Sequence, residues 1–253
     1  MATPSEPSGA PATPPAVGAD TPIYPLSLRL AGRRVLVVGG GSVAQPGYPA
    51  QRAVEAGIET ARDLVAAGNR CLVTGDMGIA NTTASAALIA VFTGAEAQEV
   101  TGRGTGIDDE MWERKVGVIR RALARHRPDP ADPLAVLAAV GGLEHAALAG
   151  FMLGAAALRT PVVLDGVIAG AAALAARALA PDVVDCLVAG HMSTEPGARH
   201  ALTALGLRPL LDLDMRLGEG SGAALAVPVV QAAARVLRDV ATFDSAGVSG
   251  AKE

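Results

Sequence analysis

A single carboxylate stands among small residues near the C-terminal end of the chain. Glu219 lies in the stretch Arg216-Leu217-Gly218-Glu219-Gly220-Ser221-Gly222, whose glycines and serine leave room for a ligand beside it. A carboxylate in such a place suits a general base, which must come within hydrogen-bonding reach of the proton that it removes. The alternative is a structural role, in which the carboxylate caps the glycine-rich turn.

A second stretch, residues 75–83, reads Gly-Asp-Met-Gly-Ile-Ala-Asn-Thr-Thr and directly follows an apolar segment. Backbone N–H groups at the start of a helix bind anions, and glycine lets the backbone approach a ligand closely. We therefore expect a phosphate site here, and the two stretches together indicate chemistry on a phosphorylated sugar. Asp76 precedes the expected helix, so it could serve the reacting sugar or be structural.

The composition favours a closely packed α/β core. The chain has 253 residues, of which 50% are apolar and only 2% aromatic. This length allows one large domain or two small ones. Alanine, leucine and valine must therefore fill the core, through close packing of helices on a sheet rather than through large rings.

Charge and hydropathy argue against nucleic acid and membranes. The net charge is -4, and the basic run 120–127 resembles the solvated end of a helix, so we expect no nucleic-acid partner. The apolar stretch from Leu134 to Leu158 is broken by Glu144 and His145. No stretch is long and clean enough to span a bilayer.

Cysteine usage and the N-terminal composition predict an intracellular protein. Cys71 and Cys186 are the two cysteines, far apart, and are expected to be buried thiols in a reducing cytoplasm. Residues 1–23 are rich in Pro, Ala, Ser and Thr without a basic flank, which predicts a disordered tail rather than a signal peptide.

A strand, glycine loop and helix recur along the chain. The expected strands are Cys71–Thr74, Pro161–Leu164, Cys186–Ala189 and Pro209–Leu211. Continuous apolar strands indicate a parallel sheet buried on both faces. We expect a Rossmann-like α/β fold with helices on both faces and helical C-terminal elements. Because ligands collect at the carboxyl ends of such strands, the loops of Asp76, Asp165, His191 and Glu219 should meet there.

The N-terminal part contains half of a dinucleotide-binding fingerprint. An expected strand, Arg34–Val38, leads into Gly39-Gly40-Gly41-Ser42-Val43-Ala44, as in the first turn of such a unit. Pro46-Gly47-Tyr48-Pro49 then breaks the chain, and a helix is expected from Ala50 to about Ala67. A nicotinamide- or flavin-linked oxidoreductase is an alternative that depends on this segment.

Six separate motifs stand along the chain: residues 75–83, Gly102-Arg103-Gly104-Thr105-Gly106, Pro161-Val162-Val163-Leu164-Asp165-Gly166, Ser193-Thr194-Glu195-Pro196-Gly197, residues 216–222 and Ala241-Thr242-Phe243. In these motifs and their order, the chain from about Tyr48 to Gly247 resembles the family of nicotinate-nucleotide:dimethylbenzimidazole phosphoribosyltransferases. The resemblance implies a phosphoribosyltransferase-like α/β domain over residues 46–253.

The N-terminal part departs from the family. The family carries a further N-terminal portion with part of the benzimidazole pocket, and nothing before Tyr48 resembles it. Residues 24–45 instead resemble the start of a siroheme-synthase-type precorrin-2 dehydrogenase, as a partial Rossmann strand and turn. We expect an N-terminally truncated family member, produced by a deletion or an error in the gene model.

The resemblance implies transfer of phosphoribose from nicotinate mononucleotide to 5,6-dimethylbenzimidazole. The products are α-ribazole 5'-phosphate and nicotinate, in the lower-ligand branch of cobalamin synthesis. Glu219 would take the N–H proton of the attacking base, in an apolar pocket that raises its pKa. Asp76 matches a second acidic position near the sugar. A catalytically impaired remnant or partner subunit that binds only the nucleotide is the main alternative.

The resemblance also implies which residues bind substrate. Lys115 would face the phosphate, although a lysine on a helix is ordinarily solvated, and Arg103 has Asp108 and Asp109 as alternative partners. Ala80 stands where the family commonly has glycine. The implied substrate-binding residues are Gly78, Ile79, Ala80, Asn81, Thr82, Gly102, Arg103, Gly104, Thr105, Gly106, Lys115, Asp165, Ser193 and Glu195.

No cofactor or metal is expected. Glu144 and His145 are adjacent on an expected helix, so they should point to different faces, and no HExxH spacing exists. The resemblance implies a homodimer with active sites near the subunit boundary. The partners expected are therefore nicotinate mononucleotide, a benzimidazole base and a second copy of the chain.

Overall fold

The computed structural model describes residues 26–30, 33–37, 50–104, 106–243 and 245–247. The tail predicted for residues 1–23, the glycine turn 39–44 and Thr105 lie outside these ranges. Strands β1 (Leu26–Leu30) and β2 (Arg33–Val37) form an antiparallel pair, with Leu26 opposite Val37. The strand predicted at 34–38 is therefore formed one residue earlier, but it pairs antiparallel with its predecessor rather than opening a parallel sheet.

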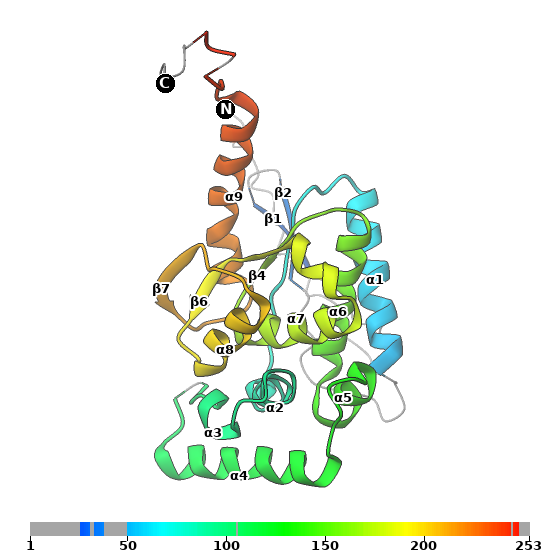
Figure 1. Ribbon diagram of the computed structural model, residues 1–253, viewed down its shortest axis with the longest axis vertical. Helices are drawn as coiled ribbons and strands as arrows, with labels where there is room; N and C mark the ends of the chain where they lie inside the picture. The colour runs from blue at the N-terminus through cyan, green and yellow to red at the C-terminus, as the bar shows by residue number, and fades with distance from the viewer. Residues whose placement is uncertain (1–25, 31–32, 38–49, 105, 244, 248–253) are drawn as a thin grey trace, which may run out of the picture.

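Two short parallel sheets carry the functional loops. The first has the order β3 (Leu72–Val73), β4 (Val162–Leu164), β5 (Leu187–Ala189), and the second pairs β6 (His191–Ser193) with β7 (Leu211–Met215). Backbone hydrogen bonds from Gly190 N to Leu164 O (2.9 Å) and from Leu210 N to Ala189 O (2.9 Å) join them. The predicted parallel sheet is thus present, but divided in two (Figure 1).

Helices cover both faces of the first sheet, as predicted. Alternate side chains of a strand point to opposite faces. Leu72, Val162 and Leu164 belong to the main core, whereas Val73 and Val163 pack in a second cluster with Ala223 and Ala226 of α9 (Ser221–Asp239). The main core is built with α2 (Asn81–Thr93), α6 (Leu143–Ala157) and α7 (Val167–Leu179).

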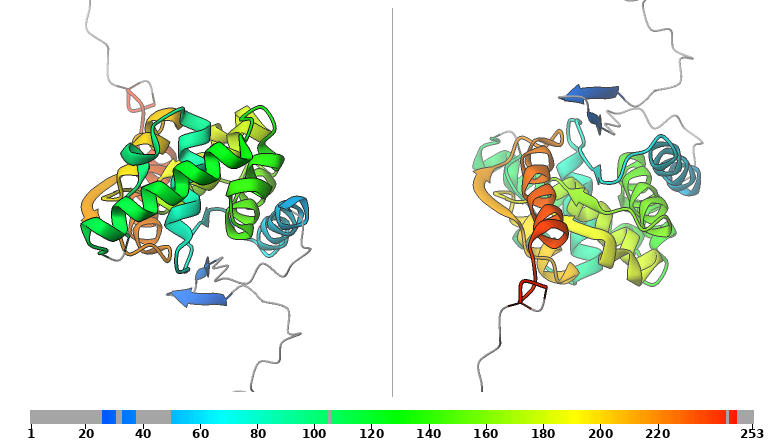
Figure 2. Two further views of the ribbon diagram at one scale, coloured as in Figure 1. Left: turned by 90° about the horizontal axis from the view of Figure 1, so that it is seen from below. Right: turned by 90° about the horizontal axis from the view of Figure 1, so that it is seen from above.

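Small residues allow the helices to pack closely. Helix α1 (Ala50–Ala66), which confirms the helix predicted from Ala50, lies beside α6 (Figure 2). A Cβ added to Gly57 would lie 2.7 Å from Phe151 N, and one added to Gly154 would lie 2.8 Å from Ile58 O. Since real Cβ atoms do not approach other atoms this closely, these positions need glycine. The core is rich in alanine, as its composition predicted.

The remaining helices complete the body of the molecule. They are α3 (Ala97–Val100), α4 (Asp109–His126), α5 (Pro133–Val140), the 3-10 helix η1 (Pro181–Cys186) and α8 (Pro196–Leu205). Helix α4 lies on the outside, and Arg120, Arg121 and Arg125 in its C-terminal half are exposed, as predicted for the basic run (Figure 1). Within the described ranges, no helix is long and apolar enough to cross a membrane.

Two local predictions were wrong. The segment after Gly190, expected to be a polar loop, forms β6. The strand expected at Pro209–Leu211 begins instead at Leu211, and its three central residues are exposed. In the part of the chain that the structure describes, β7 pairs with β6 alone. Its sequence, Leu-Asp-Leu-Asp-Met, alternates as expected for an edge strand rather than a doubly buried one.

The cysteines are free and half-buried rather than fully buried. Cys71 precedes β3 and Cys186 ends η1. Burial raises the pKa of the Cys71 thiol, which keeps it protonated and poorly reactive at neutral pH.

Candidate active site

The two predicted catalytic stretches contact each other through their backbones. Glu219 N donates to Asp76 O at 3.1 Å. A Cβ added to Gly75 would lie only 2.6 Å from Gly220 N, so the loop after β3 and the turn before α9 can meet only without a side chain there. Residues more than 140 positions apart in sequence thus form one site at the carboxyl ends of β3 and β4, where parallel sheets bind ligands.

Glu219 occupies a strained, exposed turn. Gly218, Glu219 and Gly220 have φ values of 76°, 61° and 84°, all in the left-handed region. This conformation is disfavoured for an L-residue such as glutamate, and strain of this kind is concentrated at functional sites. The Glu219 side chain is exposed. The apolar pocket predicted around it is therefore not formed by the described residues, and its role as a base stays a prediction.

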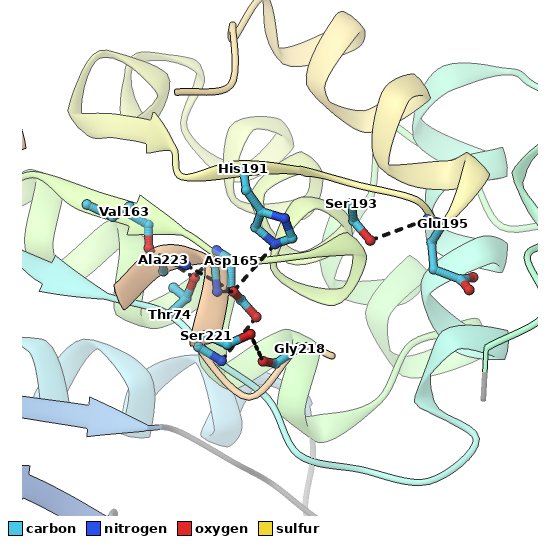
Figure 3. Close-up of polar contacts among 11 residues, drawn as sticks. Thr74, Val163, Asp165, His191, Ser193, Glu195, Gly218, Ser221 and Ala223 are labelled. Carbon is cyan, nitrogen blue, oxygen red and sulfur yellow. Dashed lines mark hydrogen bonds and ion pairs between the residues drawn. The ribbon is translucent and has the colours of Figure 1, made fainter. Parts of the chain in front are cut away.

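Asp165 anchors this turn from beneath. Its Oδ2 accepts from Gly220 N at 3.0 Å, and its Oδ1 accepts from Gly222 N at 2.9 Å and Ala223 N at 3.1 Å, as Figure 3 shows in part. The carboxylate therefore takes up the open N–H groups at the start of α9. Burial alone would raise the pKa of Asp165, but the neighbouring His191 ring and hydrogen bonds from the Ala223 and Gly220 backbone hold it below its ordinary value.

The resemblance implied that Asp165 binds substrate. In the structure the residue is 6% exposed, and its side-chain oxygens accept hydrogen bonds from the chain's own backbone. The geometry supports a positioning role for Asp165, and direct contact with substrate stays a prediction.

His191 lies behind the same turn. It is on β6, 2% exposed, with Nε2 3.6 Å from Asp165 Oδ1 (Figure 3). The ring packs against Gly222 so closely that any Cβ there would overlap it. The sequence suggested an ordinary polar loop residue, and nothing in its local pattern could have revealed this packing.

The start of α2 is open for an anion. Ala80 is the N-cap, with φ 67°, and its methyl side chain makes no capping hydrogen bond. Gly78, Ile79 and Ala80 are exposed, so the N-terminal N–H groups of α2 can reach a ligand. Asn81, in contrast, donates its side-chain amide to Asp76 Oδ2, which joins the second predicted acid to the helix start.

Lys115 joins the predicted phosphate site at the start of α2 to Gly102 of the second glycine-rich motif. Its Nζ donates to Thr82 Oγ1 at 2.9 Å and to Gly102 O at 3.0 Å. Burial lowers its pKa, and the negative charge of Glu195 opposes this effect. The predicted proximity of Lys115, Thr82 and Gly102 is therefore present in the structure, while phosphate binding by them stays a prediction.

Glu195 shapes the second loop. Its Oε1 accepts from Gly104 N at 2.9 Å, and a Cβ at Gly102 would overlap its carboxylate. Ser193 Oγ accepts from Glu195 N at 3.3 Å, which orders the turn between β6 and α8 (Figure 3). Both residues are buried. Gly106, at the end of the loop, has φ 107° and closes a turn onto Arg103 O at 3.0 Å.

Arg103 takes the alternative that the sequence left open. Its guanidinium pairs with Asp109 and donates to Ile107 O at 3.0 Å. Asp108, the other candidate, caps α4 by accepting from Met111 N at 2.8 Å. In this arrangement Arg103 supports the loop, and binding of substrate by it stays a prediction.

The cluster contains complementary elements for a sugar phosphate. The N-terminus of α2 and Lys115 lie close together, and Asp76 is joined to the same helix start through Asn81, with the backbone of Glu219 beside it. The described residues contain no group of three or more His, Cys, Asp or Glu side chains that could hold a metal ion.

The fold and the site define an α/β protein in which an exposed helix start lies beside a carboxylate-bearing turn. A family model described as "Phosphoribosyltransferase" matches residues 47–248. The chain belongs to this phosphoribosyltransferase family.

Known relatives carry a more specific name. The chain is 66% identical over 200 residues to a nicotinate-nucleotide--dimethylbenzimidazole phosphoribosyltransferase of Salinispora tropica, covering 79% of this chain and 55% of the relative. It is 52% identical to the Chloroflexus aggregans protein of the same name, covering 94% of this chain and 67% of the relative. The crystal structure of CobT from Thermus thermophilus has a TM-score of 0.75 and 53% identity, over 80% of this chain and 60% of that one.

The chain thus spans between about half and two thirds of the length of these relatives.

The sequence placed the predicted residues on loops that the structure brings together, but it did not predict three contacts: the Asn81–Asp76 bond, the Glu195–Gly104 bond, and the use of Asp165 to hold α9. The only local signal was the position of each acid directly after a strand or before a helix.

Proposed function

We propose that this chain transfers phosphoribose from nicotinate mononucleotide to 5,6-dimethylbenzimidazole, giving α-ribazole 5'-phosphate and nicotinate. The observation that carries the proposal is the hydrogen bond between Glu219 N and Asp76 O, which brings the general-base candidate to the loop that opens α2. The names of the relatives support the same reaction.

We assign each element a part in this reaction. The 5'-phosphate would bind the open N–H groups at the start of α2, with Thr82 and Lys115 beside it. The unprotonated ring nitrogen of the base would attack C1 of the ribose as the C1–N bond to nicotinate breaks, and the proton on the other ring nitrogen would pass to Glu219. The Asp76 carboxylate would stabilise positive charge on the sugar at the transition state.

An assay of the purified chain tests the proposal. The chain would be incubated with nicotinate mononucleotide and dimethylbenzimidazole, and α-ribazole 5'-phosphate measured by mass spectrometry. We expect product from wild type and from Asp212→Asn, which removes an exposed carboxylate on β7 and serves as a control.

The two alternatives give different results. Binding of nicotinate mononucleotide without product would favour a nucleotide-binding remnant or partner subunit. Stabilisation by NAD but not by nicotinate mononucleotide would favour the oxidoreductase, whose glycine turn lies outside the described residues. Either outcome would contradict the transferase proposal for this chain.

We also propose a cytoplasmic homodimer. Apolar side chains of α9, including Leu225, Val236 and Leu237, are 54%, 58% and 89% exposed, which suits burial against a second copy. The free cysteines suit a reducing compartment. Light scattering on the purified chain would measure its mass, and a monomer at micromolar concentration would contradict the dimer.

A further inference from the structure

A buried row of polar side chains runs from the start of α6 to the predicted phosphate loop. His145 Nδ1 lies 3.2 Å from Glu144 Oε1, and its Nε2 lies 2.8 Å from Ser85 Oγ. Ser85 Oγ also donates to Asn81 O at 3.0 Å, and the Asn81 side chain donates to Asp76. The row therefore connects two helices and ends at an acid of the candidate site.

The location of the row is costly. Ser85 and His145 are both 0% exposed, in a core otherwise rich in alanine and other apolar residues. Buried polar groups lose their hydration, and a well-packed apolar pair in their place would cost little or nothing. Stability alone therefore gives no reason for a serine and a histidine at these positions.

The contacts place the row where it can set the geometry of the helix start. Asn81 is the first residue of α2, and Ala80 before it provides no side-chain cap. Ser85 fixes the Asn81 carbonyl from one turn below, and His145 fixes the Ser85 hydroxyl from α6. The Glu144 carboxylate lies next to His145 Nδ1, on the side of the ring away from Ser85. Burial would raise the pKa of Glu144, but its contacts with His145 hold the pKa below the ordinary value.

We propose that Ser85 and His145 are positioning residues that hold the first turn of α2, and with it the Asn81–Asp76 pair, in the orientation that binds the nucleotide. They do not touch substrate; they act through Asn81. This inference rests on the proposed function for its ligand, but its structural part can be tested without any ligand.

The first measurement needs no substrate. The chain has two asparagines, Asn69 and Asn81, so selective 15N-asparagine labelling gives the signals of two side-chain amide groups in an NMR spectrum. Asn69, which donates to Leu64 O at 2.7 Å, is an internal reference. We expect Ser85→Ala and His145→Leu to shift or broaden the Asn81 signal and leave the Asn69 signal unchanged.

A matched control comes from the other end of α2. Thr93 Oγ1 donates to Ile89 O at 2.6 Å, which is the same type of bond as the one from Ser85 to Asn81 O. Thr93 is the last residue of α2, at the opposite end of the helix from Asn81. Thr93→Val should leave the Asn81 signal in place. His145→Gln should also leave the Asn81 signal close to its wild-type position, because a glutamine amide can reach Ser85 from a similar distance.

The second measurement is the dissociation constant of nicotinate mononucleotide by calorimetry. We expect it to rise about tenfold in Ser85→Ala and in His145→Leu, the loss expected for one buried hydrogen bond, and to stay within about threefold in His145→Gln and Thr93→Val. The double variant Ser85→Ala with His145→Leu removes both members of the buried pair, so it should fold even if a single variant does not, with the same loss of affinity.

The outcomes separate this inference from the proposed function. An unchanged Asn81 signal in folded Ser85→Ala and in the double variant would overturn the inference, and so would wild-type affinity in both. If wild type binds no nicotinate mononucleotide, the proposed function fails, and the Asn81 signal alone then decides whether the row positions the first turn.

Discussion

Asp165 and Glu219 are carboxylates of one site with opposite surroundings. Asp165 is buried and accepts three backbone N–H groups from the start of α9. Glu219 stands in the turn that this anchor holds, in a left-handed conformation and with its side chain exposed. A buried carboxylate whose oxygens accept backbone hydrogen bonds is suited to hold a loop. An exposed carboxylate without such bonds can accept a proton from a ligand.

Two helix starts differ in the same way. Helix α9 begins above a buried carboxylate that accepts its first N–H groups. The N-cap residue of helix α2, Ala80, makes no side-chain cap, and residues 77–80 before the helix are exposed. Since a helix start attracts negative charge, the start of α9 is neutralised by the protein, whereas the start of α2 is where we propose that the phosphate binds.

The largest expected effect tests the open carboxylate. Glu219→Gln keeps the size of the side chain but cannot take a proton at neutral pH. We expect the turnover number to fall by about 10²- to 10⁴-fold, the usual contribution of a general base, with little change in the melting temperature. Steady-state kinetics would measure it, with Asp212→Asn as control, and full turnover in Glu219→Gln would remove Glu219 as the base.

The next effect tests the buried carboxylate. Asp165→Ala leaves several backbone N–H groups without an acceptor and His191 without its neighbour, so we expect a loss of about 3–5 kcal/mol in the free energy of unfolding. Urea denaturation would measure it. A loss below about 1 kcal/mol would contradict the anchoring role.

The pH dependence of stability sharpens this test. Because the folded-state pKa of Asp165 lies below its unfolded-state value, the folded protein binds fewer protons on this group than the unfolded chain. Its stabilisation is complete above the unfolded pKa, near 3.9, and is lost as pH falls through the folded pKa. The stability difference between wild type and Asp165→Asn should therefore shrink below about pH 4, as thermal unfolding at several pH values would show.

A smaller effect tests the open helix start. Lys115→Met keeps the aliphatic stem but removes the donor to Thr82 and Gly102. We expect nicotinate mononucleotide to bind about 10- to 100-fold more weakly, since hydrogen bonds to charged groups contribute about 1.5–3 kcal/mol. Arg114→Met on the same helix, at an exposed position, is the control. Equal binding by Lys115→Met and wild type would contradict a phosphate role.

The smallest effect concerns the backbone of that helix start. Ala80 has φ 67°, a conformation that costs an L-residue roughly 1–2 kcal/mol, which glycine avoids at some cost in unfolded-chain entropy. We expect Ala80→Gly to raise the free energy of unfolding by up to about 1 kcal/mol. Differential scanning calorimetry would detect the change, and a destabilised Ala80→Gly would show that the alanine is not strained.

Patterns along the chain predicted much of the molecule for local reasons. The helices at Ala50 and Asn81 and the short apolar strands follow from periodicity, glycine stops and the order of strand, loop and helix. The division into two sheets and the exposed β7 were not predictable, because pairing depends on which strands meet across long stretches of sequence.

The candidate site also has a part that the sequence predicts and a part that depends on the tertiary structure. The sequence by itself determined which residues follow the strands, namely the acids at 76, 165, 195 and 219 and the glycines that let the loops approach each other. Only the tertiary structure decided their roles, because the state of a carboxylate depends on the N–H groups, charges and solvent that surround it. Asp165 accepts hydrogen bonds from the start of α9, and Glu195 accepts one from Gly104 N. The Glu219 side chain is exposed to solvent, while its backbone N–H donates to Asp76 O.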